Sequence, residues 1–150
     1  MSKSRPPLLL QVLVVGLGGV LGALARYGAA LLFNEGALLP WGTLAVNLMG
    51  CFVLALFFTI ALTRLTSDSL FVLSVTTGFI GAFTTFSSVS VESVLLTRSA
   101  VHLAVLYIFL TVTFGYLCTW AGHVLGNLIM GAGRGGQWNS HISAGGKANE

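Results

Sequence analysis

A run of small polar side chains stands inside an otherwise apolar part of the chain, in the stretch GFIGAFTTFSSVSVES from Gly78 to Ser93. Hydroxyl groups donate hydrogen bonds without carrying a charge, and the edge of an aromatic ring such as that of Phe86 is positive. Donors of this kind suit a small anion that must bind weakly enough to leave again. Hydrogen bonding between packed membrane helices is the alternative interpretation of the same hydroxyls.

Two glycines in this stretch, Gly78 and Gly81, indicate a place where a helix could break. Non-helical backbone at membrane depth is tolerated only where it is buried in protein or lines a wet cavity. A break also frees carbonyl oxygens, and oxygen ligands suit hard cations. Carbonyls converging from two copies of the chain would therefore form a cation site.

Three further polar residues fall within apolar segments. Arg26 needs a partner, water or an interface, because a charge at the centre of a membrane helix costs about 2.5–3.5 kcal/mol on insertion scales. Asn47 can tie helices together or present its NH₂ group to an anion. Glu92 lies roughly 9 Å beyond Phe86 along a helix. At that position it can be an interfacial residue, or a proton or cation site.

Near the C-terminal end of the apolar region, Tyr107 and Thr111 lie one helical turn apart on the same face. The next position on that face is Gly115, so the polar series stops there. Helix packing and pore lining both explain this pair.

The composition indicates which secondary-structure elements must position these residues. Of the 150 residues, 55% are hydrophobic and 7% are charged, whereas a soluble domain is roughly a quarter charged. A bilayer core of about 30 Å requires about 20 apolar residues per helix. Four segments meet this requirement, at about 8–33, 42–62, 70–96 and 101–129. We therefore expect an all-α membrane protein of four transmembrane helices, with the third helix broken mid-membrane.

Short connections make consecutive helices antiparallel neighbours within one domain, residues 1–130. The Gly-rich polar tail, residues 131–150, is expected to be disordered. The N-terminal charges, the apolar run and Ala23–Ala25 imitate a cleavable signal peptide. Arg26 directly after that site, and the small-residue face built on Gly18 and Gly22, favour a retained, packed helix instead.

The remaining composition excludes several classes of function. A net charge of +3 without a basic stripe does not indicate nucleic-acid binding. Cys51 and Cys118 fall inside apolar runs and predict neither a disulfide framework nor a zinc site. The chain shows no nucleophile–base pair, metal cluster or phosphate loop, so we expect that it is not an enzyme.

Charge also predicts orientation. The side that holds both termini carries Lys3, Arg5, Arg64, Arg134 and Lys147. The other side carries Arg98, together with Arg26 if its side chain reaches that interface. The positive-inside rule then places both termini in the cytoplasm.

Taken in order, GGVLGALARYG, WGTLAVNLMG and TTGFIGAFTTFSSVSVES resemble the CrcB/Fluc family of fluoride channels, over about Gly18 to Thr119. The resemblance implies a cell-membrane channel subunit that exports fluoride passively and so lowers its toxicity. It also implies an antiparallel, dual-topology dimer with two fluoride pores and a central, structural sodium ion.

The resemblance assigns roles to individual residues. Backbone carbonyls of Gly81 and Thr84 from both subunits would bind the sodium ion. Arg26 matches the arginine of the family's first helix, and Glu92 matches the acid that closes the third-helix motif. The residues expected in the fluoride pore are Asn47, Phe86, Ser88, Tyr107 and Thr111.

The sequence departs from the family pattern at two positions. Where the family usually reads TTFSTFS this chain reads TTFSSVS, so Val89 replaces the second pore phenylalanine, and Gly115 stands where a serine is common. With the biased loop charges, Val89 suggests pairing with an oppositely oriented relative that supplies the missing ring. Two alternatives remain open: a non-conducting partner subunit, and a small four-helix proton-coupled exporter.

Overall fold

The protein is described here by a computed structural model that covers the backbone of residues 6–33, 38–64 and 69–145, and the side chains of 6–33, 38–61 and 69–131. Within these ranges the regular elements are helices. They are α1 (Leu8–Phe33), α2 (Trp41–Arg64), α3 (Leu70–Leu73), η1 (Ser74–Ile80), α4 (Gly81–Phe83), α5 (Phe86–Ser99) and α6 (Val101–Gly145). Four spans are long and apolar enough to cross a membrane: Leu8–Phe33, Trp41–Ala61, Leu70–Ser99 and Val101–Gly131. The predicted all-α, four-span membrane fold is confirmed.

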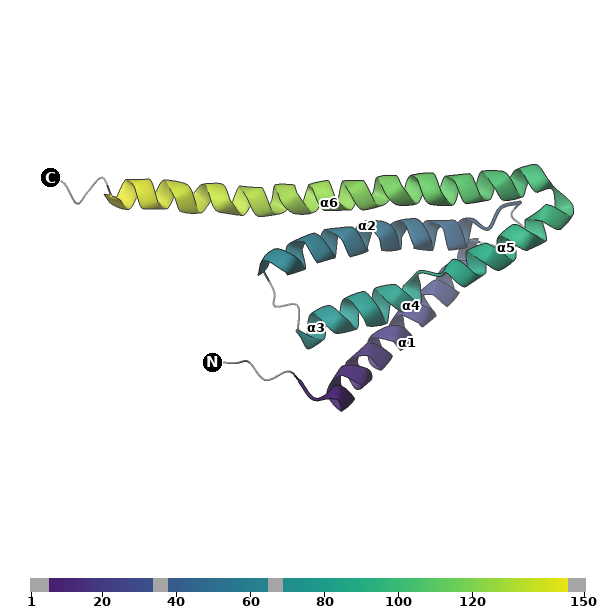
Figure 1. Ribbon diagram of the computed structural model, residues 1–150, viewed down its shortest axis with the longest axis horizontal. Helices are drawn as coiled ribbons and strands as arrows, with labels where there is room; N and C mark the ends of the chain where they lie inside the picture. The colour runs from purple at the N-terminus through teal and green to yellow at the C-terminus, as the bar shows by residue number, and fades with distance from the viewer. Residues whose placement is uncertain (1–5, 34–37, 65–68, 146–150) are drawn as a thin grey trace.

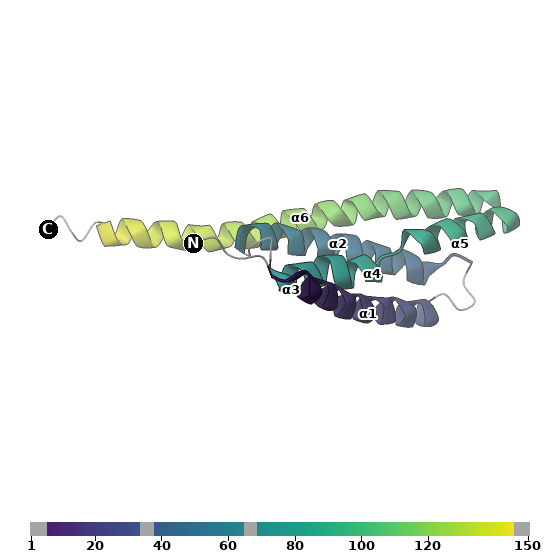
Figure 2. The ribbon, with the colours of Figure 1, turned by 60° about the horizontal axis from the view of Figure 1, so that its bottom comes forward.

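The four spans run in alternating directions, as the short connections predicted (Figure 1). Figure 2 shows α2 lying along α6, while α1 packs on the other side of the molecule against η1 and α4. α5 turns away from α1 and packs on α6. α2 therefore packs against both α1 and α6. It also contacts η1, α4 and α5 of the third span.

Prolines set the start of the first two spans. The Pro7 carbonyl accepts hydrogen bonds from Leu10 N at 3.0 Å and Gln11 N at 3.2 Å, and the Pro40 carbonyl accepts one from Leu44 N at 3.1 Å. Proline fits at a helix start because the N–H that it lacks would have no helical partner there.

The glycines of α1 serve close packing. A Cβ atom on Gly18 would lie 2.9 Å from Ser74 Oγ, and one on Gly22 would overlap the Phe79 carbonyl oxygen. From the opposite side, a Cβ on Gly78 would lie 2.7 Å from the Val15 carbonyl oxygen. These contacts bring the α1 and η1 backbones together without side chains between them, as small-residue faces do in membranes.

The third span changes helical form along its length. η1 has π-helical hydrogen bonding, α4 returns to α-helix, and the backbone is extended at Thr84, with ψ 154°, and at Thr85, with ψ 119°. The regular helix is thus interrupted at Thr84 and Thr85, just after Gly81, whereas Gly78 lies in the helical part and packs against α1. The depth of this interruption in a bilayer stays a prediction.

α6 continues as helix through Gly145, beyond the boundary at about residue 129 set by hydropathy. The last run of apolar side chains in its sequence is 128–130, close to that boundary. The segment from 131 to 145 contains no proline, so its backbone can continue the helix. Its Gly-rich composition provides few apolar side chains for packing. Disorder of the tail therefore stays a prediction. The orientation argument used Lys3, Arg5 and Lys147, which lie outside the described residues, as do the side chains of Arg64 and Arg134.

Candidate functional site

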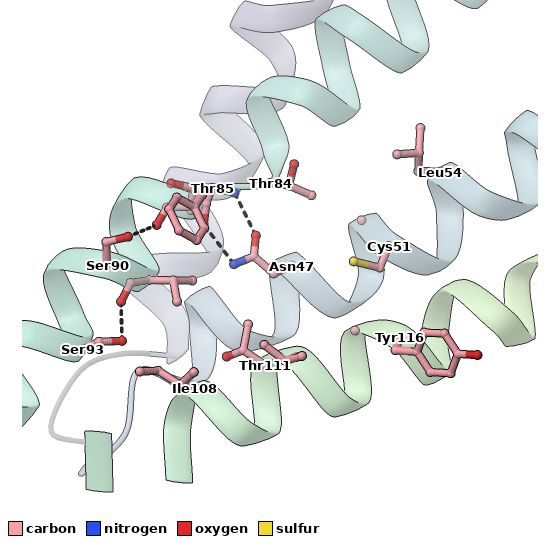
Figure 3. A pocket seen from close by; sticks show the side chains of 15 residues that line it. Asn47, Cys51, Leu54, Thr84, Thr85, Ser90, Ser93, Ile108, Thr111 and Tyr116 are labelled. Carbon is pink, nitrogen blue, oxygen red and sulfur yellow. Dashed lines mark hydrogen bonds between the residues drawn. The ribbon is translucent and has the colours of Figure 1, made fainter. Parts of the chain in front are cut away.

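One side chain from α2 holds the interruption of the third span. Asn47 Nδ2 donates a hydrogen bond to the Thr85 carbonyl oxygen at 3.1 Å, and Thr85 N donates one to Asn47 Oδ1 at 2.8 Å. Figure 3 shows this pair of bonds, with the amide reaching from α2 to the extended backbone. Both backbone polar groups of Thr85 are satisfied by a single side chain, and one N–H of the amide remains for another acceptor.

Thr85 also begins the next helix. Its Oγ1 accepts a hydrogen bond from Ser88 N at 3.2 Å, the N-cap arrangement of threonine, and donates one to Ser88 Oγ at 3.1 Å. Ser87 Oγ lies 3.2 Å from the same oxygen. α5 therefore starts from a compact hydroxyl cluster.

These two interactions change the pairing of two carbonyl groups. In a continuous α-helix, Thr85 N would bond to the Gly81 carbonyl and Ser88 N to the Thr84 carbonyl. Both N–H groups are instead directed to side chains, so neither carbonyl receives its helical bond. Backbone oxygens released in this way are ligands that suit a hard cation such as sodium.

A second polar cluster joins three helices around Glu92. Thr43 Oγ1 donates to Glu92 Oε1 at 2.7 Å, and the Tyr107 hydroxyl donates to Glu92 Oε2 at 2.7 Å. Tyr107 is completely buried. Glu92 is therefore hydrogen-bonded to both α2 and α6.

An open groove of about 620 Å³ lies beside the Asn47 amide, between the interrupted span, α2 and α6 (Figure 3). Its walls are mainly apolar, and Phe86 at its edge is 85% exposed. The hydroxyls of Ser90, Ser93 and Thr111 line the groove but donate to carbonyls of their own helices. The remaining Asn47 N–H, the Phe86 ring edge and the exposed Tyr116 hydroxyl are thus donors that the groove offers.

A smaller cavity of about 270 Å³ lies on the other side of the interruption, against α1. Arg26, Ser88 and Glu92 line it, together with Thr43. Thr85 lines both this cavity and the groove.

The structure therefore divides the residues expected in one pore. Asn47, Phe86 and Thr111 line the groove, and Ser88 lines the smaller cavity with Arg26. Tyr107 is among the lining residues of neither and contacts Glu92 from within the core.

Val89, which stands in place of the second phenylalanine, is 8% exposed. It belongs to a core cluster with Leu39, Leu44 and Tyr107 while also reaching the groove wall. A branched aliphatic side chain at this position thus fills the core of the chain.

Two residues of the site were not assigned roles from the sequence. Thr43 lies one turn before Asn47 on the same face of α2, a spacing that could have pointed to it. Thr85 appeared only as one hydroxyl among several, because the partner that gives it its role comes from another helix.

Comparison with known proteins gives consistent results. The family described as CrcB-like protein, Camphor Resistance (CrcB), matches residues 13–123. A relative from Acidobacterium capsulatum named fluoride-specific ion channel FluC is 40% identical over 127 residues, covering 81% of this chain and 99% of its own. Another FluC from Paracidovorax citrulli is 42% identical over 116 residues, covering 77% and 92%.

A third FluC, from Salinibacter ruber, is 47% identical over 92 residues, covering 60% of this chain and 68% of its own. The family match covers at least part of each of the four apolar helices and includes Arg26, Asn47, Phe86 and Glu92. The chain belongs to the CrcB family, a family of fluoride ion channels and not of enzymes.

Proposed function

We propose that this protein is a channel subunit that conducts fluoride passively out of the cell and so lowers its toxicity. One observation carries the proposal. The amide of Asn47 and the exposed ring of Phe86 line the same groove in a fold of four membrane-spanning helices. The relatives named fluoride-specific ion channels support the identity of the ion.

In this proposal fluoride loses water in the groove and gains uncharged donors. The free N–H of Asn47 and the positive edge of Phe86 replace part of its hydration shell. Ser90 and Thr111 can add a hydroxyl only by giving up a bond to their own helix, which costs about 0.5–1.5 kcal/mol. Weak binding of this kind allows the ion to leave.

Arg26 acts at one end of this path. It lines the smaller cavity with Ser88 and Glu92, and its guanidinium is the group there that attracts an anion, while the Glu92 carboxyl group is engaged by Thr43 and Tyr107. Thr85 lines both spaces. Tyr107 supports this pathway through Glu92 instead of contacting the ion.

The working unit we propose is an antiparallel dimer. A mainly apolar groove of about 620 Å³ beside an exposed Phe86 would be filled by lipid in a single subunit. A second, inverted copy would close it and separate the ion from lipid.

We place a structural sodium ion at the centre of this proposed dimer. The carbonyls of Gly81 and Thr84 lack their helical bonds, and two such pairs would supply four oxygen ligands. When bound, the ion would join the two subunits at their interrupted helices. The proposed location is the cell membrane, with both termini cytoplasmic in the favoured orientation.

A heterodimer with a related, oppositely oriented subunit is the second candidate. Val89 favours it, because this side chain lies in the core of its own subunit and presents no ring to the groove. In that case the partner would supply the second ring, and this chain alone would conduct poorly or not at all.

Fluoride efflux from liposomes that contain only this purified protein tests the proposal. Rapid efflux at a fluoride electrode, without chloride efflux and without dependence on a pH gradient, is the expected result. A pH-gradient requirement would favour a proton-coupled exporter acting through Glu92. Silent but well-folded dimers would favour the heterodimer, which co-purification of a second subunit from native membranes would then identify.

A further inference from the structure

The interruption of the third span coincides with two side chains that take over backbone N–H groups. We propose that Asn47 and Thr85 are positioning residues for the cation site: they keep the Gly81 and Thr84 carbonyls free of helical hydrogen bonds before any ion binds. This inference rests on the sodium site proposed above and names the residues that create it.

The change from helical to side-chain bonding occurs within one residue. Thr84 N still donates to the Ile80 carbonyl at 3.0 Å, as does the Thr84 hydroxyl at 3.0 Å. The next N–H along the chain, that of Thr85, donates to Asn47 Oδ1 at 2.8 Å instead. Asn47 therefore ends the series of helical hydrogen bonds at Thr85, whose N–H would otherwise bond to the Gly81 carbonyl.

The Thr84 carbonyl is kept free of its helical hydrogen bond by Thr85. Ser88 N would close the Thr84 carbonyl in a continuous helix, but it donates to Thr85 Oγ1 at 3.2 Å. The two positioning interactions are linked, because Asn47 also holds Thr85 through its carbonyl at 3.1 Å. One amide and one hydroxyl thus control both carbonyl groups.

Packing on α2 fixes the position of this segment. Gly50 lies one turn after Asn47, and a Cβ atom there would overlap Thr84 Cγ2. The interrupted backbone is therefore held against α2 by two hydrogen bonds to Asn47 and by a close contact at Gly50. Such preorganisation lowers the cost of binding, because the ligands need not be ordered by the ion.

The test compares sodium-dependent thermal unfolding of the purified full-length protein and its variants. Each sample is titrated with sodium chloride against N-methylglucamine chloride at constant ionic strength. Thr85→Val removes the acceptor for Ser88 N, Thr85→Ser keeps it, and Asn47→Leu removes the acceptor for Thr85 N. Thr119→Val is the matched control, because its hydroxyl bonds only to the Gly115 carbonyl of its own helix.

Sodium should raise the unfolding temperature of the wild-type protein, because a ligand that binds only the folded state stabilises it. Thr85→Val and Asn47→Leu should weaken the apparent sodium affinity by about 10–100-fold, the usual effect of losing a residue that orients ligands. Thr85→Ser and Thr119→Val should keep the wild-type affinity.

Unchanged sodium affinity in both Thr85→Val and Asn47→Leu would overturn this inference and leave the sodium site standing. No sodium effect on the wild-type protein would overturn the site itself. If the two variants fail to fold, amide hydrogen exchange of the wild-type 81–89 segment decides. Equal protection of Thr85 and Ser88 N–H with and without sodium supports the proposal, whereas protection that appears only with sodium contradicts it.

Discussion

The buried Tyr107 hydroxyl of α6 donates a 2.7 Å hydrogen bond to the Glu92 carboxylate of α5. Thr43 of α2 binds the other carboxylate oxygen at 2.7 Å. An acidic side chain in a membrane span needs such partners, because an unpaired carboxylate in an apolar environment is costly. Glu92 thereby joins the three helices that surround the groove.

Tyr107→Phe should destabilise the protein by about 1.5–3 kcal/mol, the usual contribution of a hydrogen bond to a charged group. The measurement is the unfolding temperature in detergent at neutral pH. Tyr116→Phe is the control: Tyr116 is 70% exposed, so its hydroxyl should contribute no more than about 0.5 kcal/mol. Equal losses in the two variants would show that the Glu92 bond does not stabilise the fold.

Gly22→Ala should separate α1 from η1 and lower stability by about 1–3 kcal/mol, as overpacking commonly does. The added methyl group would overlap the Phe79 carbonyl oxygen, which is backbone and cannot rotate away. Gly28→Ala on the same helix meets no atom within 4 Å, and should be neutral or slightly stabilising because alanine favours helix. Unfolding temperatures of both variants in the same detergent decide the point.

The four spans could be predicted because a bilayer imposes a length and an apolar composition that a sequence displays directly. α1 begins at Leu8 and ends at Phe33, as hydropathy indicated, and Pro7 and Pro40 mark helix starts for a local reason. The glycine pair of α1 was also interpretable, since the i, i+4 spacing of Gly18 and Gly22 defines a face whatever its partner is.

The location of the helix interruption could not be read in the same way. It depends on Asn47, which lies 38 positions before Thr85 in the chain, and a local pattern does not report a partner that distant. Sequence therefore pointed to Gly78 and Gly81, the residues with the greatest local freedom. The grouping of Thr43 with Tyr107 on Glu92 likewise exists only after three helices have packed.

Modification of Cys51 should reduce fluoride efflux, whereas modification of Cys118 should not. Cys51 lines the groove beside Asn47, while Cys118 is not among the groove residues. The experiment treats the reconstituted channel with a membrane-permeant maleimide. We expect inhibition of the wild-type protein and of Cys118→Ser, and resistance of Cys51→Ser. Inhibition that survives in Cys51→Ser would place the conducting path away from this groove.

Phe86→Ala should impair conduction while leaving the fold intact. Phe86 is 85% exposed and is not part of the buried core of the chain, so truncation should change the stability of the single subunit's fold by no more than about 0.5 kcal/mol. In the function proposed above, however, the ring edge is one of the donors that the groove offers to the anion. Its loss should lower fluoride efflux by about tenfold, the effect of a barrier raised by about 1.4 kcal/mol.

Phe109→Ala is the matched control for that variant. Phe109 is a phenylalanine of α6 that is 60% exposed and does not line the groove. It removes the same ring from an apolar surface, so any general effect of losing a lipid-facing aromatic will appear in both variants. Normal stability with a selective loss of efflux in Phe86→Ala assigns the ring to the ion path. Equal efflux in the two variants would instead leave the Asn47 amide as the principal donor in the groove.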